Sequence, residues 1–300
     1  MRLLKKQNLE DLLFLDIETV PCTNDFNEDH HMWDAWEYYC IKNGIEDVKN
    51  SFYDKAGLEA EFGIIACITI GVVRNGEVWL KTFSGEEAEL LKEFNEVVSG
   101  LINNKTYLCG HVVTGFDAPY IMRRCLVNRI LPLEIFDTAH LKPWEMSHLD
   151  TAVLWKNSGF KYPTLLSLTS VLGLDSPKDG ISGADVGKAF YEGRLDEIIE
   201  YCEKDVKAVV DVVTALRQED SLPLANQEGD PEAEKKGVLT YLYEGGEYNE
   251  EVEAKLIETL ATFNDKDKAA AIEILNAIPT KAKGKVTYIT KKDIKRIANG

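Results

Sequence analysis

The chain lacks any long apolar run. No stretch of 18 or more apolar residues occurs among its 300 residues, so the sequence predicts no membrane-spanning helix and no membrane partner. The N-terminal residues 1–7 also lack the extended apolar segment of a secretory signal. The sequence therefore favours a cytoplasmic protein.

Paired cysteine motifs are missing as well. Without a C-x-x-C pair we expect six buried free thiols rather than a disulfide framework, at Cys22, Cys40, Cys67, Cys109, Cys125 and Cys202. One group of cysteines and histidines lies close in sequence: Cys22, His30, His31 and Cys40. Its spacing fits none of the usual zinc-binding patterns.

Basic residues are in short supply. There are 34 Lys and Arg against 51 Asp and Glu, which gives a net charge of −17. Because phosphate contacts normally use Lys and Arg, this charge argues against an extended surface that binds duplex nucleic acid. A protein that holds only a few terminal nucleotides can rely on metal ions and a local basic rim. The basic region is the end of the chain, where residues 281–300 hold seven basic residues against one acidic residue, or +6.

The chain does contain acidic residues in three separated motifs. The first lies in residues 12–21, an apolar run of strand length that ends at a proline and is typical of a buried central strand. Side chains on a strand alternate, so Asp16 and Glu18 share one face, roughly 6 to 7 Å apart. Neighbouring carboxylates in a buried strand repel each other and lose hydration, so cations or protons must compensate.

The other two motifs are Gly115-Phe116-Asp117 and a helical segment that carries Tyr201 and Asp205. Tyr201 and Asp205 are four residues apart, so both project from one face of that helix. Carboxylates are preferred ligands of Mg²⁺ and Mn²⁺, and two such ions about 3.5 to 4 Å apart activate water and stabilise a leaving alkoxide. The motifs together predict phosphodiester hydrolysis with two divalent cations, Mg²⁺ or Mn²⁺.

In this order the motifs resemble those of the DEDD superfamily of 3′-5′ exonucleases, in its tyrosine-bearing branch. The resemblance is greatest to the exonuclease domain related to family B DNA polymerases. Residues 55–65, 142–145 and 176–179 are also similar to that family, and the resemblance covers about residues 10–217. One position departs: the family usually has Gly-His-Asn before the second motif, whereas this chain has Gly110-His111-Val112. A polar group that orients the motif or the substrate is therefore missing.

The resemblance implies a catalytic set of five residues. The metal ligands would be Asp16, Glu18, Asp117 and Asp205, with Asp16 bridging both cations. Tyr201 would orient the attacking water, because an ordinary tyrosine pKa near 10 makes the phenol a weak base at neutral pH.

The resemblance also implies a place for the substrate. Backbone amides around Ile17, Thr19 and Val20, with the Thr19 hydroxyl, would receive the 3′-terminal sugar. Phe116 would either stack on a base or pack in the core beside the motif. A stripe of aromatic residues in the 22–60 segment is likewise either core or a stacking surface: Trp33, Trp36 and Tyr39 or Cys40.

Strand and helix patterns predict an α/β fold. Asn75-Gly76 joins two strand-like runs, 64–73 and 78–83, as in a hairpin, so the first three strands should be antiparallel. A helical pattern at 86–102, a strand at 106–111 and a helix near Phe116 follow. We predict a mixed sheet flanked by helices, and the resemblance implies a ribonuclease-H-like fold.

The polar residues 219–236, with Pro223, Gly229 and Pro231, predict a linker. The exonuclease domain would then span residues 1–218. Residues 237–300 would form a small helical appendage with a basic end, with helices near 250–263, 265–278 and 290–299. This appendage either packs on the domain or binds nucleic acid or a replication or repair protein.

The leading hypothesis is a two-metal 3′-5′ exonuclease that acts on single-stranded DNA or frayed 3′ ends and releases nucleoside 5′-monophosphates. Such an enzyme would serve proofreading, DNA repair or recycling. Three alternatives stay open. One is an exoribonuclease on short RNA, and another is an inactive nuclease-like module that binds nucleic acid or a partner protein. The third is a purely structural cation site, which Tyr201 disfavours because such a site needs no phenol to orient water.

Overall fold

The computed structural model describes residues 4–139, 141, 148–176 and 180–225. The chain divides into two compact units, Met1–Ala225 and Asn226–Gly300. The predicted helical appendage with its basic end lies outside the described residues, as do most of the linker and the stretch 142–145. The proposed domain division therefore stays a prediction.

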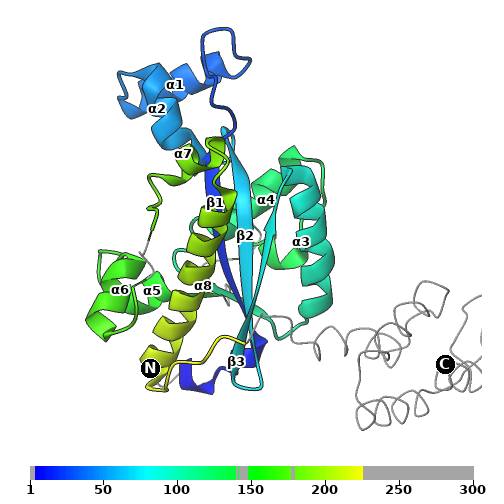
Figure 1. Ribbon diagram of the computed structural model, residues 1–300, viewed down its shortest axis with the longest axis vertical. Helices are drawn as coiled ribbons and strands as arrows, with labels where there is room; N and C mark the ends of the chain where they lie inside the picture. The colour runs from blue at the N-terminus through cyan, green and yellow to red at the C-terminus, as the bar shows by residue number, and fades with distance from the viewer. Residues whose placement is uncertain (1–3, 140, 142–147, 177–179, 226–300) are drawn as a thin grey trace, which may run out of the picture. The chain divides into compact units, whose positions relative to one another are not determined.

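A five-stranded sheet forms the centre of the first unit (Figure 1). Its order is β3 (Glu77–Ser84), β2 (Gly63–Arg74), β1 (Leu12–Pro21), β4 (Tyr107–Gly110) and β5 (Leu149–Asp150). The first three strands are antiparallel, while β4 runs parallel to β1 and β5 parallel to β4. The predicted mixed sheet is confirmed, and its topology is consistent with a ribonuclease-H-like fold.

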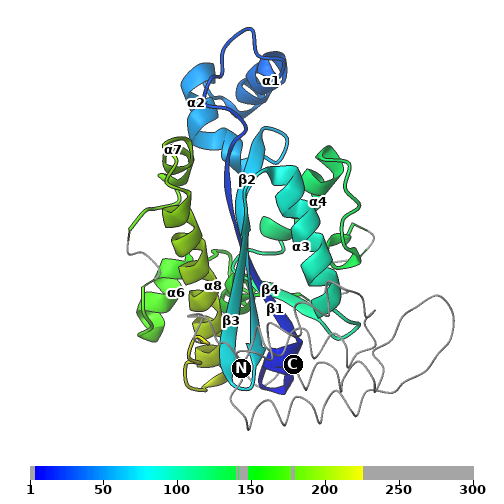
Figure 2. The ribbon, with the colours of Figure 1, turned by 45° about the vertical axis from the view of Figure 1, so that its right-hand side comes forward.

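Helices cover both faces of this sheet (Figure 2). One face carries α3 (Glu87–Leu101) and α4 (Asp117–Val127), and the other carries α8 (Leu195–Arg217), with α7 (Val186–Tyr191) before it. Strand β1 is therefore buried on both sides, which explains its almost continuous apolar sequence.

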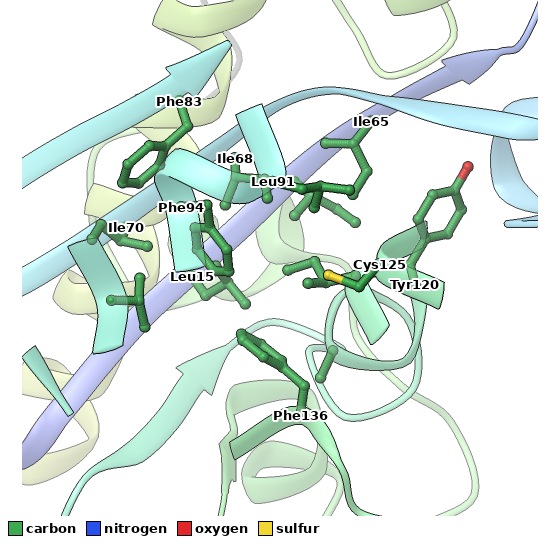
Figure 3. Packing of buried hydrophobic residues seen from close by; sticks show 14 of the residues in the cluster. Leu15, Ile65, Ile68, Ile70, Phe83, Leu91, Phe94, Tyr120, Cys125 and Phe136 are labelled. Carbon is green, nitrogen blue, oxygen red and sulfur yellow. The ribbon is translucent and has the colours of Figure 1, made fainter. Parts of the chain in front are cut away.

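The side chains of β1 alternate between two cores. Leu13, Leu15 and Ile17 pack with residues of β2, α3 and α4, among them Phe94 and the others shown in Figure 3. On the opposite face, Leu12 and Phe14 pack beneath the valines of α8, which recur at helical spacing: Val206, Val209, Val210 and Val213.

The hairpin between β2 and β3 forms where Asn-Gly predicted it. Arg74 pairs with Glu77, and the two residues between them have positive φ, 53° at Asn75 and 80° at Gly76. That conformation matches the twist of antiparallel strands and suits these two residue types.

The segment after β1 forms a small helical insert of α1 (Trp33–Asn43), α2 (Val48–Lys55) and a 3-10 turn, η3 (Ala56–Leu58). Its own core centres on Phe26 and Phe52, whose rings stack 3.7 Å apart, and on fully buried Trp36. The aromatic stripe of this insert is therefore core packing. Gly57 lies against the backbone of Val20, where an added Cβ would come within 3.1 Å, so η3 packs tightly on the end of β1.

Between β5 and α7 lie two short helices, α5 (Thr151–Lys156) and α6 (Leu165–Leu172), both beside α8. After α8 the chain turns back to the outer strand. The amide of Val78 donates to the Pro223 carbonyl, and the amide of Ala225 donates to the Val78 carbonyl, each at 2.9 Å. Residues 219–225 thus belong to the first unit. None of the described helices combines the length and apolar character that crossing a membrane requires.

Candidate active site

Three carboxylates converge between β1 and α8. Oxygens of Asp16, Glu18 and Asp205 all lie within 4.8 Å of one another. Strand alternation places Asp16 and Glu18 on the face that α8 covers, and α8 brings Asp205 over them. The common face predicted for Asp16 and Glu18 is confirmed, and the group is arranged as a cation site.

Burial makes this arrangement costly without a compensating charge. Desolvation, followed by repulsion from Asp117 and Glu18, raises the pKa of Asp16 well above its ordinary value. The pKa of Glu18 is also raised well above its ordinary value, first by desolvation and then by neighbouring groups. Divalent cations bound to these oxygens would supply the missing positive charge and favour the ionised carboxylates. The hard oxygen donors fit Mg²⁺ or Mn²⁺.

Asp117 approaches the same place from the first turn of α4. Its Oδ1 accepts a hydrogen bond of 3.1 Å from the amide of Ile17, which lies between Asp16 and Glu18 on β1. Burial raises the pKa of Asp117 to about 7 although hydrogen bonds to backbone amides lower it. Asp117 does not belong to the group of three that lies within 4.8 Å. Its charge nevertheless raises the pKa of Asp16 and of Glu18.

Tyr201 lies one helical turn before Asp205 on α8. Its phenol is half-buried, and desolvation, then the charge of Asp205 and a hydrogen bond with it, raise the pKa of Tyr201 far above the ordinary value. The phenol therefore keeps its proton at neutral pH. This agrees with an orienting role rather than that of a base.

Only some of the residues predicted to contact the substrate are accessible in the structure. The Ile17 amide is engaged by Asp117, and the Ile17 side chain lies in the core beneath α4. Val20 is fully buried among residues of α7 and α8. Thr19 is half-buried and, against the larger effect of burial, lowers the pKa of the Tyr120 phenol, whose hydroxyl donates to the Gly57 carbonyl at 2.9 Å. Phe116 is partly exposed, with its ring 5.3 Å from that of Tyr120. Thr19 and Phe116 therefore remain accessible to a substrate.

Two residues next to the predicted set were missed by sequence reasoning. The Cys202 thiol donates to Asp16, 3.4 Å from Oδ2 and 3.5 Å from the carbonyl oxygen. Glu203 accepts a 2.8 Å hydrogen bond from the Thr82 hydroxyl. The helical period of α8, which places Cys202 between buried Ile198 and Val206, was a signal for the first contact. The second contact links segments 121 residues apart, and nothing in the sequence marks it.

Asp150 organises the loop that leads into Asp117. Its carboxylate accepts from the amides of Val112 at 3.0 Å and Thr114 at 3.3 Å, and from the Thr114 hydroxyl at 2.8 Å. It also caps α5 by accepting from the Ala152 amide at 3.0 Å. One side chain thus fixes both the loop before α4 and the start of α5.

Comparison with protein families matched residues 62–212 to a family described as a predicted 3′-5′ exonuclease related to the exonuclease domain of PolB. The match covers half of the chain. The chain belongs to this family.

The matched region of this exonuclease family member contains Asp117, Tyr201 and Asp205, and the fold places Asp16 and Glu18 beside Asp205. The resemblance inferred from the motifs is confirmed. Neither the comparison with curated proteins nor that with solved structures gave a match. The chain is thus a nuclease of the hydrolase class with nucleic acid as its substrate, and its acidic group is suited to metal ions.

Proposed function

We propose that this protein is a two-metal-ion-dependent 3′-5′ exonuclease. It would hydrolyse the phosphodiester bond at the 3′ end of single-stranded DNA and release nucleoside 5′-monophosphates. The observation that carries the proposal is the convergence of Asp16, Glu18 and Asp205 within 4.8 Å, with buried Asp117 beside them.

The proposed metal ligands are Asp16, Glu18, Asp117 and Asp205. Two Mg²⁺ or Mn²⁺ ions held there would lower the pKa of water and stabilise the leaving alkoxide. The carboxylates fix the place of the reaction, because β1 and α8 hold them together, with Glu18 buried and Asp16 and Asp205 half-buried. Asp117 has one oxygen committed to Ile17, which keeps the start of α4 against β1.

Tyr201 has the role of an orienting group. Its phenol stays protonated and lies on the same helix face as Asp205, so it can hydrogen-bond the attacking water and fix its direction. Thr19 and Phe116 supply the contacts to the terminal nucleotide that the structure leaves accessible. The amide of Ile17 acts indirectly, by holding Asp117.

The first test is metal-dependent degradation of an end-labelled single-stranded oligonucleotide. With Mg²⁺ or Mn²⁺ the wild type should give a ladder that shortens from the 3′ end, with 5′-monophosphates as products. Asp16→Asn removes a charged ligand without changing side-chain size and should lower the rate by at least about a hundredfold, since even partners of metal ligands cost 10- to 100-fold.

The matched control is Asp54→Asn, the same change at an exposed position of α2. It should leave the rate unchanged. No metal-dependent cleavage by the wild type, or equal rates for the wild type and Asp16→Asn, would refute the proposal. The same oligonucleotide made as RNA measures the preference for DNA.

A further inference from the structure

An acid-free stretch of this strongly acidic chain packs beside α8, the helix that carries Asp205. Residues 151–174, which form α5, α6 and the segment between them, contain no Asp or Glu, whereas the whole chain carries −17. Two lysines, Lys156 and Lys161, give this stretch a net positive charge. A polyanion meets less repulsion here than over the rest of the chain on average.

The same stretch exposes large aromatic side chains. Phe160 is 98% exposed, Tyr162 55% and Trp155 43%. We call residues 155–162 the aromatic segment. By contrast, the aromatic residues of the helical insert stack inside its own core, as fully buried Trp36 shows.

A lysine is placed over one of these rings. Lys156 Nζ lies 4.1 Å from the centroid of the Tyr162 ring. This contact joins the two ends of the aromatic segment and brings an ammonium group to an exposed aromatic face. Positive charge interleaved with exposed rings is the combination by which proteins hold single-stranded nucleic acid without regard to sequence.

The aromatic segment is tied to the loop before Asp117. His111 Nδ1 lies 2.9 Å from Thr151 Oγ1, and its Nε2 donates to the Pro163 carbonyl at 3.1 Å. These two partners flank the aromatic segment on either side. Asp150 binds the same loop through the Val112 amide. The aromatic segment is thereby held to the loop that leads into Asp117, and it connects α5 and α6, which both contact α8, the helix that carries Asp205 (Figure 1).

We propose that the aromatic segment is a stacking platform for unpaired nucleotides that precede the 3′-terminal one. This inference rests on the proposed function and deepens it, because it makes an extended single strand the preferred substrate. The bases would stack on Trp155, Phe160 and Tyr162, and Lys156 and Lys161 would meet the phosphates. A duplex cannot use the platform, since its bases are already stacked on one another.

The test compares substrates of different length. The variant Phe160→Ala with Tyr162→Ala should raise KM at least about tenfold for an oligonucleotide of about 12 nucleotides. It should leave kcat/KM for a dinucleotide unchanged, because a dinucleotide does not reach the platform. The matched control is Tyr38→Ala, since Tyr38 is also exposed, at 59%, and has Lys42 over its ring at 4.9 Å.

A binding measurement separates failure of this inference from failure of the proposed function. Fluorescence anisotropy with a labelled 12-nucleotide single strand uses the full chain carrying Asp16→Asn, so cleavage does not interfere. Adding Phe160→Ala and Tyr162→Ala should weaken binding at least about tenfold. Replacing Lys156 and Lys161 by Gln should reduce the slope of log K against log salt by about 1.4 in magnitude if each meets one phosphate.

Equal binding with and without the aromatic side chains would overturn the inference, whether or not the enzyme cleaves. A parallel loss of dinucleotide cleavage would also overturn it, because the effect would then lie in the fold or the carboxylate group. Analytical ultracentrifugation gives a third outcome that would overturn the inference. If the wild type sediments as a dimer and these substitutions convert it to a monomer, the aromatic segment binds a second copy of the chain.

Discussion

Val112 stands in a backbone conformation that suits it poorly. Its φ is 64°, in the left-handed region, where a β-branched side chain is strained. The loop imposes this conformation: the Val112 amide donates to Asp150, and its carbonyl accepts from the amides of Gly115 and Phe116. The exonuclease family usually has Asn at this position, and Asn tolerates the left-handed region.

Replacing this valine should therefore relieve strain. We expect Val112→Asn to raise the free energy of unfolding by about 1 kcal/mol and the melting temperature by about 2 to 4 °C. Thermal denaturation followed by circular dichroism measures both. The control is Val127→Asn, at an exposed position of α4 where the two residues have similar helix propensity, so little change is expected. A lower melting temperature for Val112→Asn would show that the valine side chain is needed.

At the scale of elements, the orientation of α8 matters most. This helix carries Tyr201 and Asp205, and its buried valines fix its distance from the sheet but only weakly its rotation. A chain of hydrogen bonds adds that constraint: Glu203 accepts from Thr82 at 2.8 Å, and the hydroxyls of Thr82 and Thr69 lie 2.9 Å apart. Thr69 is the cross-strand partner of Asp16. The helix and the first carboxylate strand thus share one polar link.

Removing the Thr82 hydroxyl, which joins Glu203 to Thr69, should lower both stability and catalysis. Thr82→Val removes the hydroxyl with little change in volume and should lower the free energy of unfolding by about 1 to 2 kcal/mol. We also expect kcat on the oligonucleotide to fall about tenfold, because a small displacement of a catalytic group is costly.

The comparison for that variant is Thr169→Val in α6. Thr169 is fully buried, and its hydroxyl donates to the Leu166 carbonyl, far along the chain from the carboxylate motifs. It should lose similar stability and keep the wild-type kcat. If both variants lower kcat equally, the link through Thr82 has no specific role.

Sequence patterns were sufficient to predict those elements that depend on neighbouring residues alone. The alternation in β1 predicted the common face of Asp16 and Glu18, and Asn75-Gly76 predicted the hairpin. The helical period of α8 indicated that Cys202 faces the sheet, but its partner Asp16 lies 186 residues away and followed only from the fold. The contacts of Glu203 and the Ile17 amide also depend on the packing of distant segments, and no local pattern marks them. The aromatic segment did leave a signal, because aromatic and basic residues recur there without any acid, but its exposure required the fold.

For the whole molecule, the buried carboxylates couple stability to pH and metal. Folding raises the pKa of Asp117 from 3.8 to about 7, and it raises the pKa of Asp16 and Glu18 as well. At these three carboxyl groups the folded metal-free protein therefore holds more protons than the unfolded chain above pH 4. The stability that these groups contribute is present at low pH and is lost as pH rises through the folded pKa.

We expect the protein in excess chelator to melt at a higher temperature at pH 6 than at pH 8. Asp117 alone would account for about 1.4 kcal/mol over this interval, or roughly 3 to 5 °C. Adding Mn²⁺ should raise the melting temperature more at pH 8, since the cation need not displace protons there. Asp117→Asn should reduce the pH dependence. A melting temperature that stays constant between pH 6 and pH 8 in chelator would contradict the coupling.

The short return of the chain onto β3 has a practical consequence for anyone expressing the first unit alone. A truncated protein that ends with α8 would lose two hydrogen bonds of β3, from the Val78 amide to Pro223 and from the Ala225 amide to the Val78 carbonyl. An unpaired outer strand invites edge-to-edge aggregation. Crystallisation trials should therefore keep every residue through Ala225.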